Sequence, residues 1–188
     1  MALLPSIPAA AMHGAVVPIA YQVADGTSAY ITFNNIPQGY QDLRIIIYSR
    51  SGTTGTNTDI YLRLATAGGG VDTGTNYSVT RLYGNGSSAS SDRFSTQNSI
   101  DFAGTIASGA TSGIFGSANL DILNYSNATT YKTTISRSAS DVNGAGFTFL
   151  TAGLWRNTGA ITSVQVFTNT SFATGSTATL YGIRTVGQ

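Results

Sequence analysis

The triplet Asp72-Thr73-Gly74 is the motif of this sequence that most resembles a catalytic site. Asp-Thr-Gly is the short signature of aspartic proteases, which need two carboxylates sharing one proton on a sheet with apolar flanks. Here a run of glycines, Gly68–Gly70, precedes the triplet, and Asn76 follows it. Because three-residue motifs recur by chance, the sequence favours a turn in which Asp72 hydrogen-bonds to its own backbone.

The chain has almost no residues for histidine or cysteine chemistry. His13 is the only histidine and lies in a proline-rich segment, and there is no cysteine and no Gly-x-Ser-x-Gly motif. A Ser-His-Asp hydrolase would depend on this one histidine, and a zinc site lacks its usual ligands. Asp25, Asp72 and Asp141 fall in expected loops, but without the spacing of an EF-hand. We therefore expect no enzyme, no catalytic residues, no metal site and no cofactor.

The composition is typical of an all-β protein. Ser and Thr make up roughly a quarter of the chain, well above ordinary usage. All eight acidic residues are Asp, eight of the nine basic residues are Arg, and 22 glycines supply turns. Glu and Lys are good helix formers, whereas Thr, Tyr, Phe, Val and Ile favour strands. The length of 188 residues predicts one domain.

The charge pattern limits the expected partners. The net charge is +1 and the basic residues are scattered, so no nucleic-acid partner is expected. Met1–Ala20 is apolar, but Pro5, Pro8 and Pro18 interrupt it and no Lys or Arg precedes its apolar part. This pattern is not typical of a secretory signal, and it is too broken for a membrane-spanning helix. No membrane partner is expected.

Residues 42–50 show the clearest strand pattern. Leu43, Ile45 and Ile47 lie on one face, which we expect in the core, and the other face is mixed. Residues 84–93 are polar and are expected to form a loop, with Asn85-Gly86 as its turn. Similar alternation predicts ten strands over residues 27–33, 42–50, 59–64, 76–83, 99–106, 119–125, 130–137, 147–155, 161–168 and 178–184. The predicted fold is one all-β domain, residues 21–188, that forms a jelly-roll-like antiparallel β-sandwich.

Residues 1–20 are expected to form an extended N-terminal arm, because prolines fix φ and remove backbone donors. Two interpretations remain open for this arm. It can be a strand or strap that packs on its own domain, or a tether that lies on a neighbouring subunit. In the second case the partner interface consists of the arm's large apolar residues. They are Leu3, Leu4, Ile7, Met12, Val16, Val17 and Ile19.

Several phrases along the chain, in their order, resemble virion structural proteins of tailed bacteriophages. The phrases are Ile31–Pro37, Tyr40, Leu43-Arg44, Tyr61–Leu64, Asn76–Ser78, Leu82–Gly84, Asn124-Tyr125, Tyr131–Thr133, Trp155-Arg156 and Leu180–Ile183. They span about residues 28 to 184, nearly the whole domain. One departure is visible after Leu64, where similar sequences carry a short Asn-Gly-Asp corner and this chain has a long glycine-rich loop.

The resemblance implies a β-sandwich module of the phage head or tail, without catalytic residues, that assembles as a symmetric oligomer. We expect a capsid decoration (cement) protein that forms a homotrimer, contacts the major capsid protein or other virion proteins, and lies on the capsid surface. The alternative is a tail-associated receptor-binding or carbohydrate-binding module. Trp155, Tyr83 and Tyr181 could stack on a sugar, although a single Trp at a strand end is more typical of a core. The absence of repetitive shaft sequence favours decoration.

Overall fold

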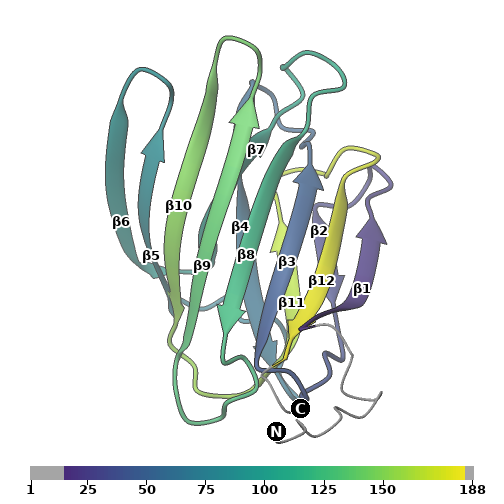
Figure 1. The fold of residues 1–188 in the computed structure, drawn as a ribbon, viewed down its shortest axis with the longest axis vertical. Coiled ribbons are helices and arrows are strands. Elements are labelled where there is room, and N and C mark those ends of the chain that lie inside the picture. The colour runs from purple at the N-terminus through teal and green to yellow at the C-terminus, as the bar shows by residue number, and fades with distance from the viewer. Residues whose placement is uncertain (1–14, 185–188) are drawn as a thin grey trace, which may run out of the picture.

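The structure is a computed structural model that describes residues 15–184, and every regular element within that range is a β-strand. The strands form two antiparallel sheets, one of eight strands and one of four, which lie face to face (Figure 1). The prediction of an all-β antiparallel sandwich is confirmed.

The spatial order of strands in each sheet differs from their order in the sequence. The larger sheet contains β1 (Val16–Val23), β12 (Thr177–Ile183), β3 (Asp42–Ser49), β8 (Gly116–Leu123), β9 (Lys132–Asp141), β10 (Gly146–Trp155), β5 (Tyr77–Gly84) and β6 (Ala89–Gln97), in that order. The smaller sheet contains β2 (Tyr30–Phe33), β11 (Ile161–Phe167), β4 (Asn57–Thr66) and β7 (Ile100–Ile106).

The strand pairs are nested. β1 pairs with β12, β2 with β11, β3 with β8, and β4 with β7, alternately in the larger and the smaller sheet. The chain thus doubles back on itself as one long ribbon, while β9, β10, β5 and β6 extend one side of the larger sheet. This nesting supports a jelly-roll-like winding, which stays a prediction.

The core lies between the sheets and is built from alternate residues of each strand. Leu43, Ile45 and Ile47 of β3 are at most 1% exposed, so the predicted core face is confirmed. Leu62 and Leu64 of β4 are fully buried from the opposite sheet. Each such aliphatic side chain contributes about 1.5–3 kcal/mol relative to an exposed one.

The free edge of the smaller sheet is closed by small polar side chains of β9. Ser136 and Ser138 point inward and are buried against β7. The Ser136 hydroxyl donates to the Phe102 carbonyl at 2.5 Å, and the Gly104 amide donates to the Ser138 hydroxyl at 3.1 Å. Backbone groups on an edge strand otherwise remain unpaired, so these serines satisfy the edge of β7.

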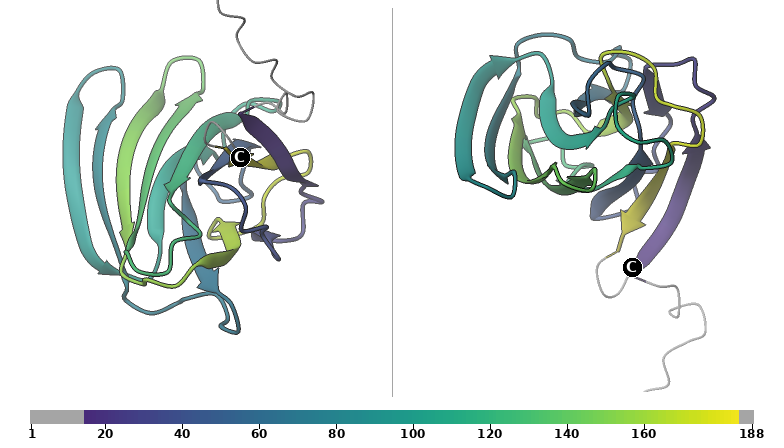
Figure 2. Two further views of the ribbon diagram at one scale, coloured as in Figure 1. Left: turned by 60° about the horizontal axis from the view of Figure 1, so that its bottom comes forward. Right: turned by 90° about the horizontal axis from the view of Figure 1, so that it is seen from above.

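The larger sheet extends past the smaller one on the side of β5 and β6 (Figure 2). Nearly every residue of β6 is exposed. The β5–β6 and β9–β10 turns contain Asn85-Gly86 and Asn143-Gly144, where Gly86, Asn143 and Gly144 have positive φ. Asn85-Gly86 is the turn that the sequence predicts, and Asn-Gly is a sequence typical of tight hairpin turns.

Two edge strands differ from the sequence expectation. The predicted loop at residues 84–93 is wrong in part, because Ala89–Gln97 forms β6. The predicted arm overlaps β1, which begins at Val16 and pairs with β12 of the same chain. Val16 to Ala20 therefore belong to the sandwich, as in the first interpretation of the arm. Residues 1–14 lie outside the described residues.

Candidate interaction surface

The side chains of the larger sheet that point away from the smaller sheet form a surface that we call the outer face. It faces the viewer in Figure 1. One row crosses all eight strands through directly paired residues: Tyr21, Thr179, Ile46, Asn119, Arg137, Leu150, Leu82 and Ser91. The next row contains Tyr181, Arg44, Asp121, Ile135, Ala152, Thr80 and Arg93.

Large apolar side chains are unusually exposed on the outer face. On the strands from β3 to β5 their exposure runs from 41% to 54%, and the set is Ile46, Tyr48, Leu82, Leu123, Ile135 and Leu150. Leu150 and Leu82 are direct cross-strand partners, so their side chains form one continuous apolar surface. β1 adds Val16, Tyr21 and Val23 at the sheet edge. Gathered apolar groups of this kind mark contact surfaces of soluble proteins.

Charged side chains interrupt this apolar surface at two places. Arg44 Nε lies 2.6 Å from Asp121 Oδ1, in a pair that is partly exposed and therefore contributes little to stability. Arg137 lies between Asn119 and Leu150 and makes no salt bridge among the described residues. Arginine beside apolar side chains is enriched at the centres of protein interfaces.

The local sequence explains why this face is apolar. β3 contains the run Ile45-Ile46-Ile47, and β10 contains Phe149-Leu150, so both strands carry apolar residues on both faces. A sheet that is solvated on one side normally alternates apolar and polar residues. Sequence reasoning missed Leu82, Ile135 and Leu150 as surface residues. The signal that could have found them is apolar residues in both registers of one strand.

Three of the four sheet edges, those formed by β1, β6 and β7, are poor docking sites. In β1, Pro18 has no amide donor and a bulge separates Pro18 from Ala20. β6 is polar, and its Thr96 has a positive φ of 57°. β7 is closed by the serines of β9. Such features prevent strand addition, so partner contacts are expected on faces rather than edges.

The predicted interface residues of the arm divide into two groups. Val16, Val17 and Ile19 lie in β1, where Val16 is 46% exposed and Ile19 packs partly against the core. Leu3, Leu4, Ile7 and Met12 lie outside the described residues, as does His13.

Asp72 holds a turn together. Its Oδ1 accepts from the Gly74 amide at 2.8 Å, and its Oδ2 accepts from Trp155 Nε1 at 2.7 Å and from Asn76 Nδ2 at 2.9 Å. Burial raises the pKa of Asp72, but the hydrogen bonds from Trp155, Asn76 and Gly74 outweigh it and leave the pKa below its usual value. The expected backbone turn is confirmed, and the carboxylate is fully engaged in it.

The aromatic residues that could meet a sugar are not gathered at one place. Trp155 is 1% exposed and stacks on buried Tyr77 with ring centroids 6.1 Å apart, so it is a core residue. Tyr83 stacks on Phe149 at 5.4 Å on the inner side of β5. Tyr181 is half-buried on the outer face.

A charged cluster lies where the inner side of β5 and β6 meets β7. Arg81 donates to both oxygens of Asp92, at 2.8 and 2.7 Å, and also to Asp101. Burial raises the pKa of Asp101 to about 7, with the negative charge of Asp59 as a further cause. Burial likewise raises the pKa of Asp59. The cluster therefore contains three carboxylates and one guanidinium.

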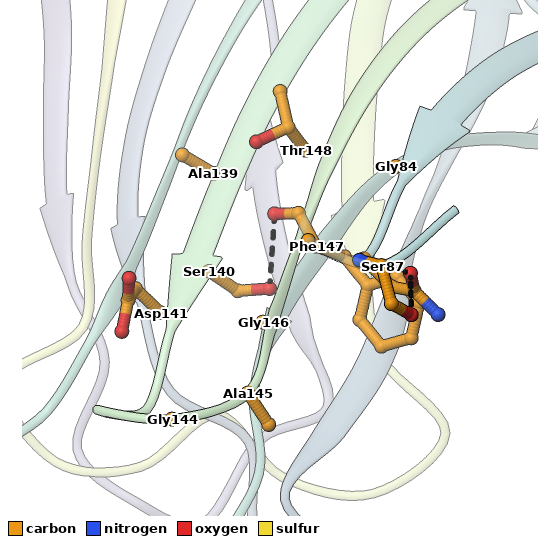
Figure 3. A pocket seen from close by; sticks show the side chains of 12 residues that line it. Gly84, Ser87, Ala139, Ser140, Asp141, Gly144, Ala145, Gly146, Phe147 and Thr148 are labelled. Carbon is orange, nitrogen blue, oxygen red and sulfur yellow. Dashed lines mark hydrogen bonds between the residues drawn. The ribbon is translucent and has the colours of Figure 1, made fainter. Parts of the chain in front are cut away.

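Two cavities share part of their lining, and Asp59 of this cluster lines the smaller one. The larger one, about 730 Å³, separates the β5–β6 and β9–β10 turns, and Figure 3 shows Phe147, Ser87, Ser140 and Asp141 among its lining residues. The smaller cavity, about 190 Å³, is lined by Asn57, Thr58, Asp59, Gly104, Ser140, Phe147 and Phe149. Ser140 and Phe147 line both.

Comparisons with protein-family models, with curated proteins and with solved structures find no match. Within residues 15–184 no group of three His, Cys, Asp or Glu side chains is arranged to hold a metal ion. The same residues contain no helix long and apolar enough to cross a membrane.

Proposed function

We propose that this chain is a non-enzymatic structural protein of a bacteriophage virion, a capsid decoration (cement) protein that stabilises the shell through protein–protein contacts. The observation that carries the proposal is the outer face, where exposed apolar side chains on six of the eight strands lie beside Arg, Tyr and Asn side chains. A surface of this composition suits lasting contacts with proteins. The resemblance of the sequence phrases to those of phage virion proteins supports the virion context.

The proposed partners are further copies of this chain and the major capsid protein. The protected sheet edges leave the faces and the N-terminal segment for these contacts. The net charge of +1 leaves little repulsion between copies. Closed symmetry is the usual result of self-association, and we propose a homotrimer.

Binding to capsids tests the role of the outer face. Leu150 and Tyr30 are both 50% exposed, on opposite sides of the sandwich. We expect Leu150→Asp to weaken binding to undecorated capsids at least tenfold, or about 1.4 kcal/mol, because it places a charge in the contact. Tyr30→Asp adds the same charge elsewhere and should bind normally. Co-sedimentation with capsids measures both. Equal binding by the two variants, or no binding by the unmodified protein, contradicts the proposal.

Analytical ultracentrifugation tests the proposed trimer. The unmodified protein is expected to sediment as a trimer at micromolar concentration, with the same mass for Tyr30→Asp. A monomer in solution that is also a monomer on the particle contradicts self-association.

The larger cavity favours a second candidate, a tail-associated receptor-binding or carbohydrate-binding module. Its lining combines the Phe147 ring with the polar side chains of Ser87, Ser140 and Asp141 (Figure 3). Aromatic faces surrounded by polar groups are common in small-molecule sites. In that case Phe147→Ala removes binding to saccharides of the host surface, whereas Leu150→Asp leaves it unchanged. Saccharide binding by the unmodified protein, measured by calorimetry, distinguishes this role from decoration.

A further inference from the structure

We propose that the smaller cavity is a binding site for an organic cation, namely a primary ammonium or guanidinium group. The cavity lies between β4, β7 and the inner side of β10, away from the outer face. The inference therefore does not depend on the role proposed above.

Two acceptor side chains that line this cavity receive no hydrogen bond from the described residues. Asp59 lines it and accepts no hydrogen bond from any residue that the structure describes. Asn57 lines it too, and the Asn57 side-chain oxygen is buried with no partner among the same residues. A buried acceptor without a donor is destabilising, so a ligand that donates N–H groups is favoured here.

The charges around the cavity also favour a ligand that carries a positive charge. Arg81 is the only cation of the neighbouring cluster that the structure shows, and its guanidinium is already held by Asp92 and Asp101. Asp59 interacts with the positive charge of Arg81 only at longer range. When ionised, the three carboxylates outnumber the one guanidinium, and a second cation can neutralise the excess negative charge.

The aromatic walls are suited to a cation. Phe147 and Phe149 both line the cavity, and their ring centroids are 5.9 Å apart. The guanidinium carbon of Arg81 already lies 5.7 Å from the centre of the Phe149 ring. Cations within about 6 Å of an aromatic ring centroid are attracted by its quadrupole. A carboxylate beside two phenyl rings is thus a site for an organic cation.

Size and ligand geometry argue against a single water molecule or a calcium ion as the occupant. The volume of about 190 Å³ exceeds by several-fold the roughly 30 Å³ that one water occupies. A calcium ion needs six to eight oxygen ligands, whereas phenyl rings form part of these walls. An ammonium or guanidinium group on a short methylene stem fits both the volume and the walls.

The position of Phe149 depends on Gly104. A Cβ atom at residue 104 would lie 2.7 Å from the Phe149 ring, so only glycine lets this ring approach β7 so closely. Gly104 also lines the cavity. Its backbone amide is therefore a local reporter for binding.

A titration of the full chain, monitored by NMR, tests the proposal. n-Butylammonium and methylguanidinium chloride are added at pH 8, above the pKa of about 7 of Asp101. We expect saturable shifts at the amide of Gly104 and the side-chain amide of Asn57, and no saturable shift with the neutral analogue n-butanol. No saturable shift with either cation, or an equal response to n-butanol, overturns the proposal.

Two variants of equal charge change provide the control. Asp59→Asn removes the carboxylate in the cavity and should weaken both cations at least tenfold. Asp25→Asn removes an exposed carboxylate elsewhere and should leave binding unchanged. Binding that survives Asp59→Asn overturns the proposal. Because burial raises the pKa of Asp59 and so favours its neutral form, a neutral amide side chain at this position is compatible with the fold.

A capped tripeptide with one central lysine identifies the source of the cation. Shifts as large as those with n-butylammonium support the site and point to a lysine side chain of a partner protein. Shifts with n-butylammonium alone support the site and point to a free amine.

Discussion

Adjacent residues of β3 have opposite environments, and this difference can be measured. Ile45 is fully buried, whereas Ile46 is 41% exposed on the outer face. We expect Ile45→Ala to lower the free energy of unfolding by about 2–5 kcal/mol, because it leaves a cavity in the core. Ile46→Ala should cost less than about 1 kcal/mol, as exposed substitutions usually do. Urea unfolding measures both. Equal losses would contradict the register of β3.

Asp101 gives stability an unusual dependence on pH. Its pKa is about 7 in the fold, against 3.8 for the free side chain, so the folded state holds this proton more tightly. The resulting stabilisation is complete below pH 4 and is lost as the pH rises through 7. The free energy of unfolding should therefore fall between pH 5 and pH 8, by at most about 1.4 kcal/mol per pH unit from this residue.

Urea unfolding of Asp101→Asn at pH 5 and pH 8 checks that origin. The variant should show a flatter dependence, because residue 101 no longer takes up a proton. Asp25→Asn is the control, since the pKa of Asp25 is lowered and it stays ionised throughout this range. A slope that is unchanged in Asp101→Asn would assign the effect to other groups, such as Asp59.

The elements of this sandwich are joined by polar as well as apolar contacts. Ser138 of β9 accepts the buried amide of Gly104 on β7. We expect Ser138→Ala to lower the free energy of unfolding by about 1–3 kcal/mol, because that amide loses its acceptor. Thr133→Ala, on the exposed side of β9, should be nearly neutral. Thermal unfolding of both variants, monitored by circular dichroism, is the measurement.

Most elements could be predicted because their residues alternate between core and solvent. β2 and β4 show this alternation in sequence, and both strands are found where they are predicted. β6 was missed because its sequence lacks this alternation. Both of its faces are exposed, and Phe94 is its only large apolar residue. The first residues of β1 were predicted as part of an arm because of Pro18. An edge strand tolerates a proline, because not every backbone position of an edge strand needs an N–H donor.

The candidate sites were harder to predict than the strands. The exposure of Leu150 and Leu82 depends on their pairing across β10 and β5, which no local pattern contains. The cavity beside Asp59 depends on Phe149 of β10 meeting β4 and β7, which are distant in sequence. Alternation places a side chain on a face, but only the order of strands in the sheets brings separate faces together.

At the scale of the whole molecule, the N-terminal segment can be separated from the sandwich. A chain that lacks residues 1–14 keeps every strand that the structure describes. We expect it to fold with its free energy of unfolding unchanged within about 0.5 kcal/mol. Because it loses Leu3, Leu4, Ile7 and Met12, we expect weaker binding to capsids in the co-sedimentation experiment.

Deleting residues 1–20 is the matching control, since it also removes five of the eight residues of β1. That chain should lose stability as well as binding. Normal capsid binding by the chain without residues 1–14 would show that these four apolar residues are not part of the interface.

The pairing of β1 with β12 has a consequence for synthesis of the protein. β12 lies between β1 and β3, so neither strand has this neighbour until residues 177–183 have left the ribosome. Chains with such distant pairings fold slowly, on the order of milliseconds to seconds, and their unpaired strands are exposed meanwhile. Pro18 and the β9 serines protect only the finished sandwich. In the nascent chain, β1 and β3 therefore expose backbone groups that β12 covers in the finished sandwich.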